Sequence, residues 1–313
     1  MRAAKGTGIH RPALRRYTAR MPVFAVPNAA ISTDKPSRRR RWIPVSLRMF
    51  AGILVVLSVG SALLIGVPIY RQQVVIREIK RVGGVYTTRH GGPAWVRSWI
   101  GDERMSVFEP VRHVAFYGIE GDSNLVAVLA RLPSLPELES VYLTYSPVSD
   151  MSLIHLRRLR KLEDLDLTGT AIDGAGLAHL VELPSLRFLN LKKTRINDGV
   201  LPTLKQMRAL EGLGLDQTNV TDAGLATLRS FPHLSALGLD GTRITDRGLA
   251  ELAGMKNLKH LTLSQTEITN AGLKYLKSMP ALKSVNLDSS GVTWDGSGEL
   301  RRDLPNLNVS NFR

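Results

Sequence analysis

The chain of 313 residues contains no cysteine. This absence excludes disulfide bonds, cysteine-ligated zinc, a cysteine nucleophile and a lipidated N-terminal cysteine, but it is compatible with a location outside the cytoplasm. The seven histidines form no His-Glu-x-x-His motif, and no glycine-rich run has the spacing of a phosphate-binding loop. We therefore expect no enzymatic activity, no cofactor and no small-molecule substrate. With 43% hydrophobic and 22% charged residues, the chain can still bury a core.

Acidic residues are almost absent from the first 48 positions, which hold twelve Lys and Arg side chains and the single acid Asp34. This segment accounts for +11 of the formal net charge of +15, whereas residues 111–313 hold 23 basic and 22 acidic groups. Nucleic-acid binding needs Lys and Arg clustered on one face. The near-neutral C-terminal part therefore argues against a nucleic-acid partner, and we interpret residues 1–48 as a disordered cytoplasmic tail.

Acids, Lys, Arg and His are all missing from the 22 residues Met49–Tyr70, MFAGILVVLSVGSALLIGVPIY. At about 1.5 Å per residue, a helix of this length spans roughly 33 Å, enough for the core of a bilayer. A buried helix of a soluble protein would keep a polar stripe, and a cleaved signal peptide would end in an A-x-A site. The run Arg38–Arg41 also invites a twin-arginine export interpretation, although the strong hydrophobicity argues against it. We favour an uncleaved transmembrane signal anchor.

Basic residues on the two sides of this segment predict its orientation. Six Lys and Arg side chains lie in the twenty residues before it, and five lie in residues 71–90. Six further basic groups upstream favour an N-terminus in the cytoplasm. The rest of the chain is then expected on the extracytoplasmic side of the cell membrane, held by a single span.

The remaining sequence repeats every 24 residues, with the pattern LxxLxLxxTxITDxGLxxLxxLxx. In L-x-x-L-x-L the last two leucines alternate, which predicts one short strand per repeat with its leucines buried. A single repeat cannot bury these leucines alone, so the repeats must stack. We expect a right-handed α/β solenoid with a parallel sheet on its concave side and short helices on its convex side. The seven regular repeats begin at Leu138, Leu162, Leu186, Leu210, Leu234, Leu258 and Leu282.

Two polar positions of the repeat have predicted structural roles. An inward hydroxyl after each strand can bond to buried backbone of the turn; these residues are Ser146, Thr170, Thr194, Thr218, Thr242, Thr266 and Ser290. Residue types that cap helix N-termini then precede each helix; they are Asp173, Asn197, Thr221, Thr245 and Thr269, followed in four repeats by Asp198, Asp222, Asp246 and Asn270.

The pattern resembles leucine-rich repeat proteins of the ribonuclease-inhibitor-like class, in a 24-residue variant with Thr where many relatives carry Asn or Cys. The resemblance covers about residues 111–313, or about eight repeats with the irregular ends. The arginine-rich tail, the apolar segment and VVIREIKRVGGVY at Val74–Tyr86 are also similar to membrane-anchored bacterial leucine-rich repeat proteins. This resemblance implies an architecture and no assigned activity. Val200 departs from the pattern, because it replaces a glycine, and we expect only a local adjustment there.

The two ends of the repeats need caps, because each exposes the edge of the core. We expect residues 71–110 to form juxtamembrane helices and an N-terminal cap, with Trp95 and Trp99 covering the edge of the first repeat. At the other end, Asp288–Glu299 is interpreted as a lengthened turn. His155 and His179 occupy equivalent positions of successive repeats, but a zinc site needs two more ligands, so we favour surface histidines.

The concave face is the expected binding surface, since solenoids generally use it. Its lining is locally acidic and has aromatic residues toward its N-terminal half, a residue type enriched in protein-binding hot spots. The candidate partner-binding residues are Tyr142, Tyr145, Asp164, Asp166, Phe188, Lys192, Asp216, Asp240 and His260. The pair of Asp164 and Asp166 arises from strand alternation and has no base, nucleophile or cofactor loop beside it.

Two functions remain open. The first is a membrane-anchored module that binds a protein or a cell-envelope component outside the cytoplasm, with a basic partner suiting the acidic face. The second is a structural or scaffolding envelope protein without a discrete ligand.

Overall fold

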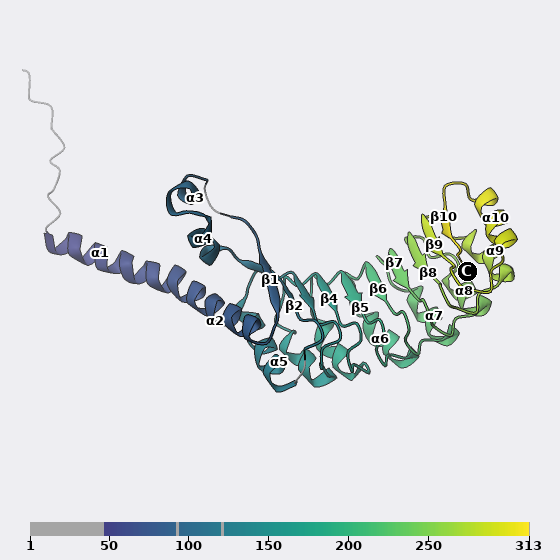
Figure 1. Cartoon of the computed structure of the whole chain (residues 1–313), viewed down its shortest axis with the longest axis horizontal. Coiled ribbons are helices and arrows are strands. Elements are labelled where there is room, and N and C mark those ends of the chain that lie inside the picture. The colour runs from purple at the N-terminus through teal and green to yellow at the C-terminus, as the bar shows by residue number, and fades with distance from the viewer. Residues whose placement is uncertain (1–46, 92–93, 120–121, 313) are drawn as a thin grey trace, which may run out of the picture. The chain divides into compact units, whose positions relative to one another are not determined.

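The computed structural model describes residues 47–91, 94–119 and 122–312. The predicted basic tail therefore lies outside the described residues, apart from its last two positions. Residues Ile53–Arg313 form one compact unit, separate from Met1–Gly52, and Figure 1 shows the repeats of this unit stacked side by side.

The first described element is a long apolar helix made of α1 (Leu47–Ser61), the π-helical turn η1 (Ala62–Gly66) and α2 (Val67–Arg81). Pro68 follows the π turn and lacks the N–H that a regular helix would need there, which accounts for the local change of helix type. The stretch Gly52–Arg81 is 30 residues long, and its most apolar window of 18 residues has a mean hydropathy of 2.4 and no buried residues. Within the described ranges it is the one helix whose length and composition suit a bilayer crossing.

All ten strands belong to a single sheet in which they follow the order of the chain. The first strand is antiparallel to the second, and the others pair in parallel with a register of 24 residues from β3 onward. The strands are β1 (Val85–Thr88), β2 (Val111–Ala115), β3 (Ser140–Tyr142), β4 (Asp164–Asp166), β5 (Phe188–Asn190), β6 (Gly212–Gly214), β7 (Ala236–Gly238), β8 (His260–Thr262), β9 (Ser284–Asn286) and β10 (Asn308–Ser310).

Short helices follow the strands on the other side of the core. They are α5 (Asp122–Leu129), η3 (Leu132–Ser134), η4 (Asp150–His155), η5 (Ala175–Leu180), η6 (Asp198–Val200), α6 (Leu201–Leu204), α7 (Asp222–Leu228), α8 (Asp246–Leu252), η7 (Asn270–Gly272), α9 (Leu273–Leu276) and α10 (Trp294–Asp303). The segments η3, η6 and η7 are 3₁₀ turns, of which η6 and η7 continue into α6 and α9. The segments η4 and η5 are 3₁₀-helix throughout, instead of the expected α-helical turns. Their N-terminal cap positions form no side-chain cap bond, whereas Thr221 and Thr245 cap α7 and α8.

The predicted row of inward hydroxyl groups, one after each strand and here called the hydroxyl ladder, is present. Thr170, Thr194, Thr218, Thr242 and Thr266 each donate a hydrogen bond of 2.5 to 2.6 Å to the carbonyl oxygen three residues earlier. All five side chains are buried. These hydroxyl groups donate to carbonyl groups of the turn after each strand, which have no hydrogen-bond partner on a neighbouring strand.

Replacing Thr242 with valine tests the ladder. Valine has the shape of threonine but cannot donate to the Leu239 carbonyl oxygen, which accepts from the Thr242 hydroxyl at 2.5 Å. We expect the free energy of unfolding to fall by about 1 kcal/mol, the usual net worth of one hydrogen bond. Urea unfolding followed by circular dichroism measures this, with the half-buried Thr203→Val on α6 as the control. If the two variants were equally stable, the hydroxyl ladder would not contribute to the stability of the domain.

The acids that follow the cap residues link one repeat to the next instead of capping their own helices. Asp198 accepts from the backbone N–H of Thr221 at 2.8 Å and from its hydroxyl at 2.6 Å. Asp222 and Asp246 bond in the same way to the threonine of the following repeat. The assignment of these acids as simple cap residues is therefore wrong. Their partners are 23 residues away, so the local sequence pattern could not reveal them.

At one position an apolar contact replaces the hydrogen bonds between an acid and the next repeat. Gly174 stands where the acid would be, in a left-handed conformation with φ of 115°, and Val200 stands where the next repeat has glycine. A Cβ atom at Gly174 would lie 2.2 Å from Val200 Cγ2. The valine methyl groups therefore fill the space that a carboxylate fills elsewhere, and the adjustment at Val200 involves both repeats.

The N-terminal cap differs from the sequence expectation. Val75, Ile76 and Ile79 of α2 are buried in the core, but the edge of the sheet is closed by β1. Trp95 and Trp99 lie on α3 (Ala94–Ile100) and are 71% and 82% exposed, so they do not cover the first repeat. Backbone hydrogen bonds from an added strand close a sheet edge more completely than side chains do.

At the C-terminal end, the interpretation of Asp288–Glu299 as a lengthened turn is wrong. Thr293 caps α10, which begins inside this stretch and buries Leu300. β10 then pairs with β9, and Val309 completes the core. The capping residue and Leu300 seven positions later carry the helical signal that the glycines of this stretch obscure.

Candidate binding groove on the strand face

The open side of the sheet, here called the strand face, presents two columns of side chains. The parallel register aligns each residue with the equivalent one 24 positions away. The first column contains Ser140, Asp164, Phe188, Gly212, Ala236, His260 and Ser284, and the second contains Tyr142, Asp166, Asn190, Gly214, Gly238, Thr262 and Asn286.

A groove of about 440 Å³ lies on this face over β3 to β8. It brings together six of the nine residues proposed from the sequence, which are Tyr142, Asp164, Asp166, Phe188, Asp216 and His260. The structure adds the polar side chains of Asn190 and Thr262. The groove thus has an aromatic and acidic end at β3 to β5 and a polar end at β8.

Glycines on β6 and β7 create the floor of the groove. A Cβ atom at Gly212 would lie 2.6 Å from Phe188 Cδ1, and one at Gly238 would lie 2.6 Å from Asp216 Oδ2. The absence of side chains lets the larger residue of the preceding strand lie over the glycine beside it. These glycines therefore define the depth of the groove.

Tyr142 and Asp164 form a hydrogen-bonded pair on neighbouring strands. The Tyr142 hydroxyl donates to Asp164 Oδ2 at 2.8 Å. Burial raises the pKa of Asp164, and the nearby charge of Asp166 acts in the same direction. Burial also raises the pKa of Tyr142. This carboxylate is therefore partly dehydrated, and a cation placed beside it would interact more strongly than with a solvated surface acid.

Several of the other acids of the strand face also hold the backbone. Asp166 Oδ1 accepts from the Thr168 N–H at 2.7 Å, and Asp216 Oδ1 accepts from the Asp240 N–H at 3.0 Å. Asp240 in turn accepts from the Ser264 N–H at 2.7 Å, and burial raises the pKa of its carboxyl group. Part of the acidic character of this face therefore serves the fold, and Thr168 and Ser264, whose N–H groups make two of these bonds, are buried.

Tyr145, Lys192 and Asp240 are not among the residues that line the groove. Tyr145 lies in the turn after β3 with φ of 53° and packs over Gly169, where its hydroxyl accepts from Lys193 Nζ at 3.0 Å. Lys192 is half-buried at the corresponding turn after β5. All three follow the ends of their strands, but Asp216 holds the same repeat position as Lys192 and Asp240 and does line the groove.

The small net charge of the repeat domain is unevenly distributed. The six connections from each convex helix to the next strand, residues 156–163, 181–187, 205–211, 229–235, 253–259 and 277–283, contain twelve Lys and Arg against three Asp and Glu. Stacking places these connections along one edge of the sheet. The net charge of the repeat domain is therefore close to zero because a basic edge of the sheet offsets the strand face. The charged residues of the strand face are mostly acids.

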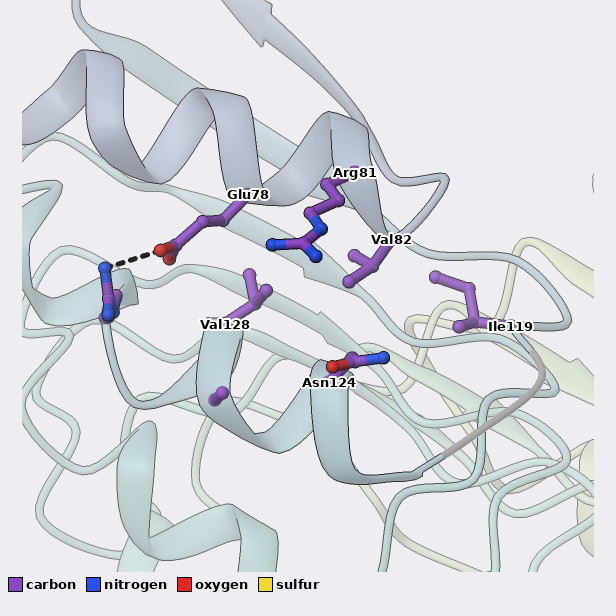
Figure 2. A pocket seen from close by; sticks show the side chains of 8 residues that line it. Glu78, Arg81, Val82, Ile119, Asn124 and Val128 are labelled. Carbon is purple, nitrogen blue, oxygen red and sulfur yellow. Dashed lines mark hydrogen bonds and ion pairs between the residues drawn. The ribbon is translucent and has the colours of Figure 1, made fainter.

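A second cavity of about 320 Å³ lies where α2 meets the first repeat. Figure 2 shows Glu78 and Arg81 on α2 facing Asn124 and Val128 on α5, and Arg131 donates to Glu78 Oε1 at 2.5 Å. The ion pair ties the helix to the repeats. Among the described residues, no three His, Asp or Glu side chains are grouped to hold a metal ion.

Stacked units that each contain an LxxLxL strand, a buried threonine and a short outer helix define a leucine-rich repeat solenoid. The family description "Leucine Rich repeat" matches residues 158–181 and 254–277. Among solved structures, internalin C2 from Listeria monocytogenes is similar at 20% sequence identity, with a TM-score of 0.49, over 68% of this chain and 84% of that chain. The comparison with curated proteins found no match.

Proposed function

We propose that the protein is a membrane-anchored, non-catalytic leucine-rich repeat module that binds a basic protein or cell-envelope component outside the cytoplasm. The groove on the strand face carries this proposal, because it joins an exposed aromatic ring, Phe188, with the partly dehydrated Asp164. Phe188 is 41% exposed beside a glycine floor that leaves room for a partner. Aromatic anchors in such depressions account for much of the free energy of protein association.

The apolar helix Gly52–Arg81 supports the membrane anchor, since its length and hydropathy suit one crossing. Ser58 and Ser61 donate to the carbonyl groups of Leu54 and Leu57, at 2.7 and 2.5 Å, so their hydroxyl groups have partners within the helix. The basic residues before the helix favour a cytoplasmic N-terminus. The repeat domain then lies on the opposite side of the membrane.

Replacing Phe188 with alanine tests the groove as the binding surface. We expect recovery of the partner by crosslinking in intact membranes to fall about tenfold or more, as for a hot-spot aromatic. The exposed Met151 on η4 offers a matched control, because Met151→Ala removes apolar surface away from the groove. Equal recovery from the two variants would favour the second candidate, a scaffolding protein without a discrete ligand, whose acids serve the fold alone.

A further inference from the structure

We propose that α3 and the neighbouring 3₁₀ turn η2 (Ser106–Phe108) lie in the headgroup region of the bilayer, with Trp95 and Trp99 inserted at its surface. The inference rests on the proposed function, which supplies the membrane span. The partner surface is the leaflet from which the apolar helix emerges.

The position of η2 along the apolar helix follows from two hydrogen bonds. Gln72 Nε2 donates to the Glu109 carbonyl oxygen at 2.7 Å, and Gln73 Nε2 donates to that of Val107 at 3.4 Å. These glutamines are two and three residues beyond Tyr70, or about 3–5 Å along a helix. The turn therefore lies at the level where the chain leaves the apolar core of the bilayer.

Glu109 holds α3 at the same position along the apolar helix as η2. Its carboxylate is 3% exposed and accepts from Arg97 of α3 at 2.8 Å and from the Thr88 hydroxyl of β1 at 2.7 Å. Arg97 also donates to Asp102 on α4 (Asp102–Met105) at 2.8 Å. Since α3, β1 and η2 all meet at this carboxylate, α3 is held beside the start of the juxtamembrane part of α2.

The side chains that α3 and η2 expose are those that prefer a membrane interface. Trp95 and Trp99 are 71% and 82% exposed, and Phe108 and Val107 are 53% and 38% exposed. The tryptophans are four residues apart and therefore share one face of the helix. Tryptophan combines a large apolar ring with an N–H donor, which suits the boundary between headgroups and acyl chains.

Basic groups at the same level complement anionic headgroups. Arg71 directly follows the apolar segment, and it lines a cavity of about 400 Å³ with Tyr70, Arg131 and Ser134. Each Lys or Arg held near an anionic leaflet is attracted by its surface potential. Apolar insertion and charge together identify an anionic bilayer as the surface that covers this region.

This contact would set the orientation of the repeats relative to the membrane. The helix enters the core of the first repeat directly through Val75, Ile76 and Ile79, which are at most 4% exposed. A second contact beside the span, through α3, would restrict tilt and rotation of the whole domain and so determine where the groove faces.

The lack of cysteine in the chain allows single cysteines to be labelled with a fluorophore in the full-length protein. We would compare Trp99→Cys with Trp294→Cys, an exposed tryptophan in the last repeat, and Val55→Cys, an exposed residue of the apolar helix. The proteins are reconstituted in vesicles of phosphatidylcholine and phosphatidylglycerol. Quenching is measured with lipids that carry a nitroxide either near the headgroup or deep in the acyl chain.

We expect the label at position 99 to be quenched about twofold more by the shallow nitroxide than by the deep one, as for an interfacial side chain. The label at position 55 should show the reverse order, and the label at position 294 should show no quenching. A label at position 99 that behaves like that at 294, while position 55 is quenched, would overturn the interfacial contact and leave the span intact. A label at position 55 that escapes quenching would overturn the span and the proposed function with it. Labelled Trp95→Cys repeats the measurement at an independent site on the same helix face.

Discussion

Replacing Gly174 with aspartate is expected to destabilise the repeat domain by about 3 kcal/mol, the range of severe backbone strain and overpacking. Gly174 has φ of 115°, which a residue with a Cβ atom rarely adopts, and the new Cβ would meet Val200 Cγ2 at 2.2 Å. Replacing Val200 with glycine in the same chain is expected to recover most of the loss. The double variant restores the acid and glycine of the other repeats, so that the new carboxylate can accept from the Asn197 N–H as Asp198 does from Thr221.

Urea unfolding of the wild type, the two single variants and the double variant measures the coupling between the two positions. We expect the double variant to be more stable than the sum of the single effects predicts, by about 2 kcal/mol, which is in the range for residues in direct contact. Val200→Gly alone serves as the control for lost packing. Additive effects would show that Gly174 and Val200 vary independently, and that the space between them can relax.

Replacing Glu109 with alanine is expected to release the N-terminal cap from the repeats. The Glu109 carboxylate is buried and accepts from Arg97 and Thr88, so its removal breaks both contacts and leaves Asp102 as the ion-pair partner of Arg97. Loss of one member of a buried pair costs about 3 kcal/mol or more. Because a solenoid unfolds locally from its ends, we expect faster hydrogen exchange at β1 and the adjoining edge of β2, with little change at β6.

The same carboxylate makes the cap sensitive to acid. Hydrogen bonds from Arg97, Thr88 and His90 lower the pKa of Glu109 from 4.5 to about 2. The stabilisation is therefore fully present above pH 4.5, where the unfolded chain is ionised, and is lost as the pH falls from there through the folded value of about 2. Glu109→Gln should remove this pH dependence of exchange at β1, whereas Glu103→Gln, on the exposed surface of α4, should keep it. A wild-type cap with the same protection at pH 5 and pH 3 would contradict the assignment, since about three quarters of this interval lies between the two pKa values.

Features that depend on local pattern could be predicted from the sequence. Alternating leucines identified strands such as Leu165 with Leu167, both of which are fully buried. The position of Thr170 after that strand was enough to predict its bond to the turn, because donor and acceptor are three residues apart. Thr221 could be identified as an N-cap because capping is satisfied within the first turn of a helix.

Features that depend on the neighbouring repeat could not be predicted from the sequence. Asp198 has the residue type of a cap, yet its partners are the backbone and hydroxyl group of Thr221. The reason for a glycine at position 212 is the lateral overlap of Phe188 from the neighbouring repeat, which excludes a Cβ atom there. β1 has no buried alternating residues, so no sequence signal distinguished it from a loop.

The sequence by itself determined the period of 24 residues, the α/β solenoid with its buried leucines and threonines, and the presence of one apolar segment long enough to cross a membrane. These follow from spacing along the chain, which sets the face on which each side chain lies. The tertiary structure decided which of the polar residues remain available. The register of the strands directs Asp216 to the backbone of the next repeat, pairs Asp164 with Tyr142, and opens the groove over the glycines. It also leaves Trp95 and Trp99 exposed on α3, because β1 closes the sheet edge in their place. Such outcomes depend on atoms more than twenty residues apart in sequence, which only the stacking of the repeats brings into contact.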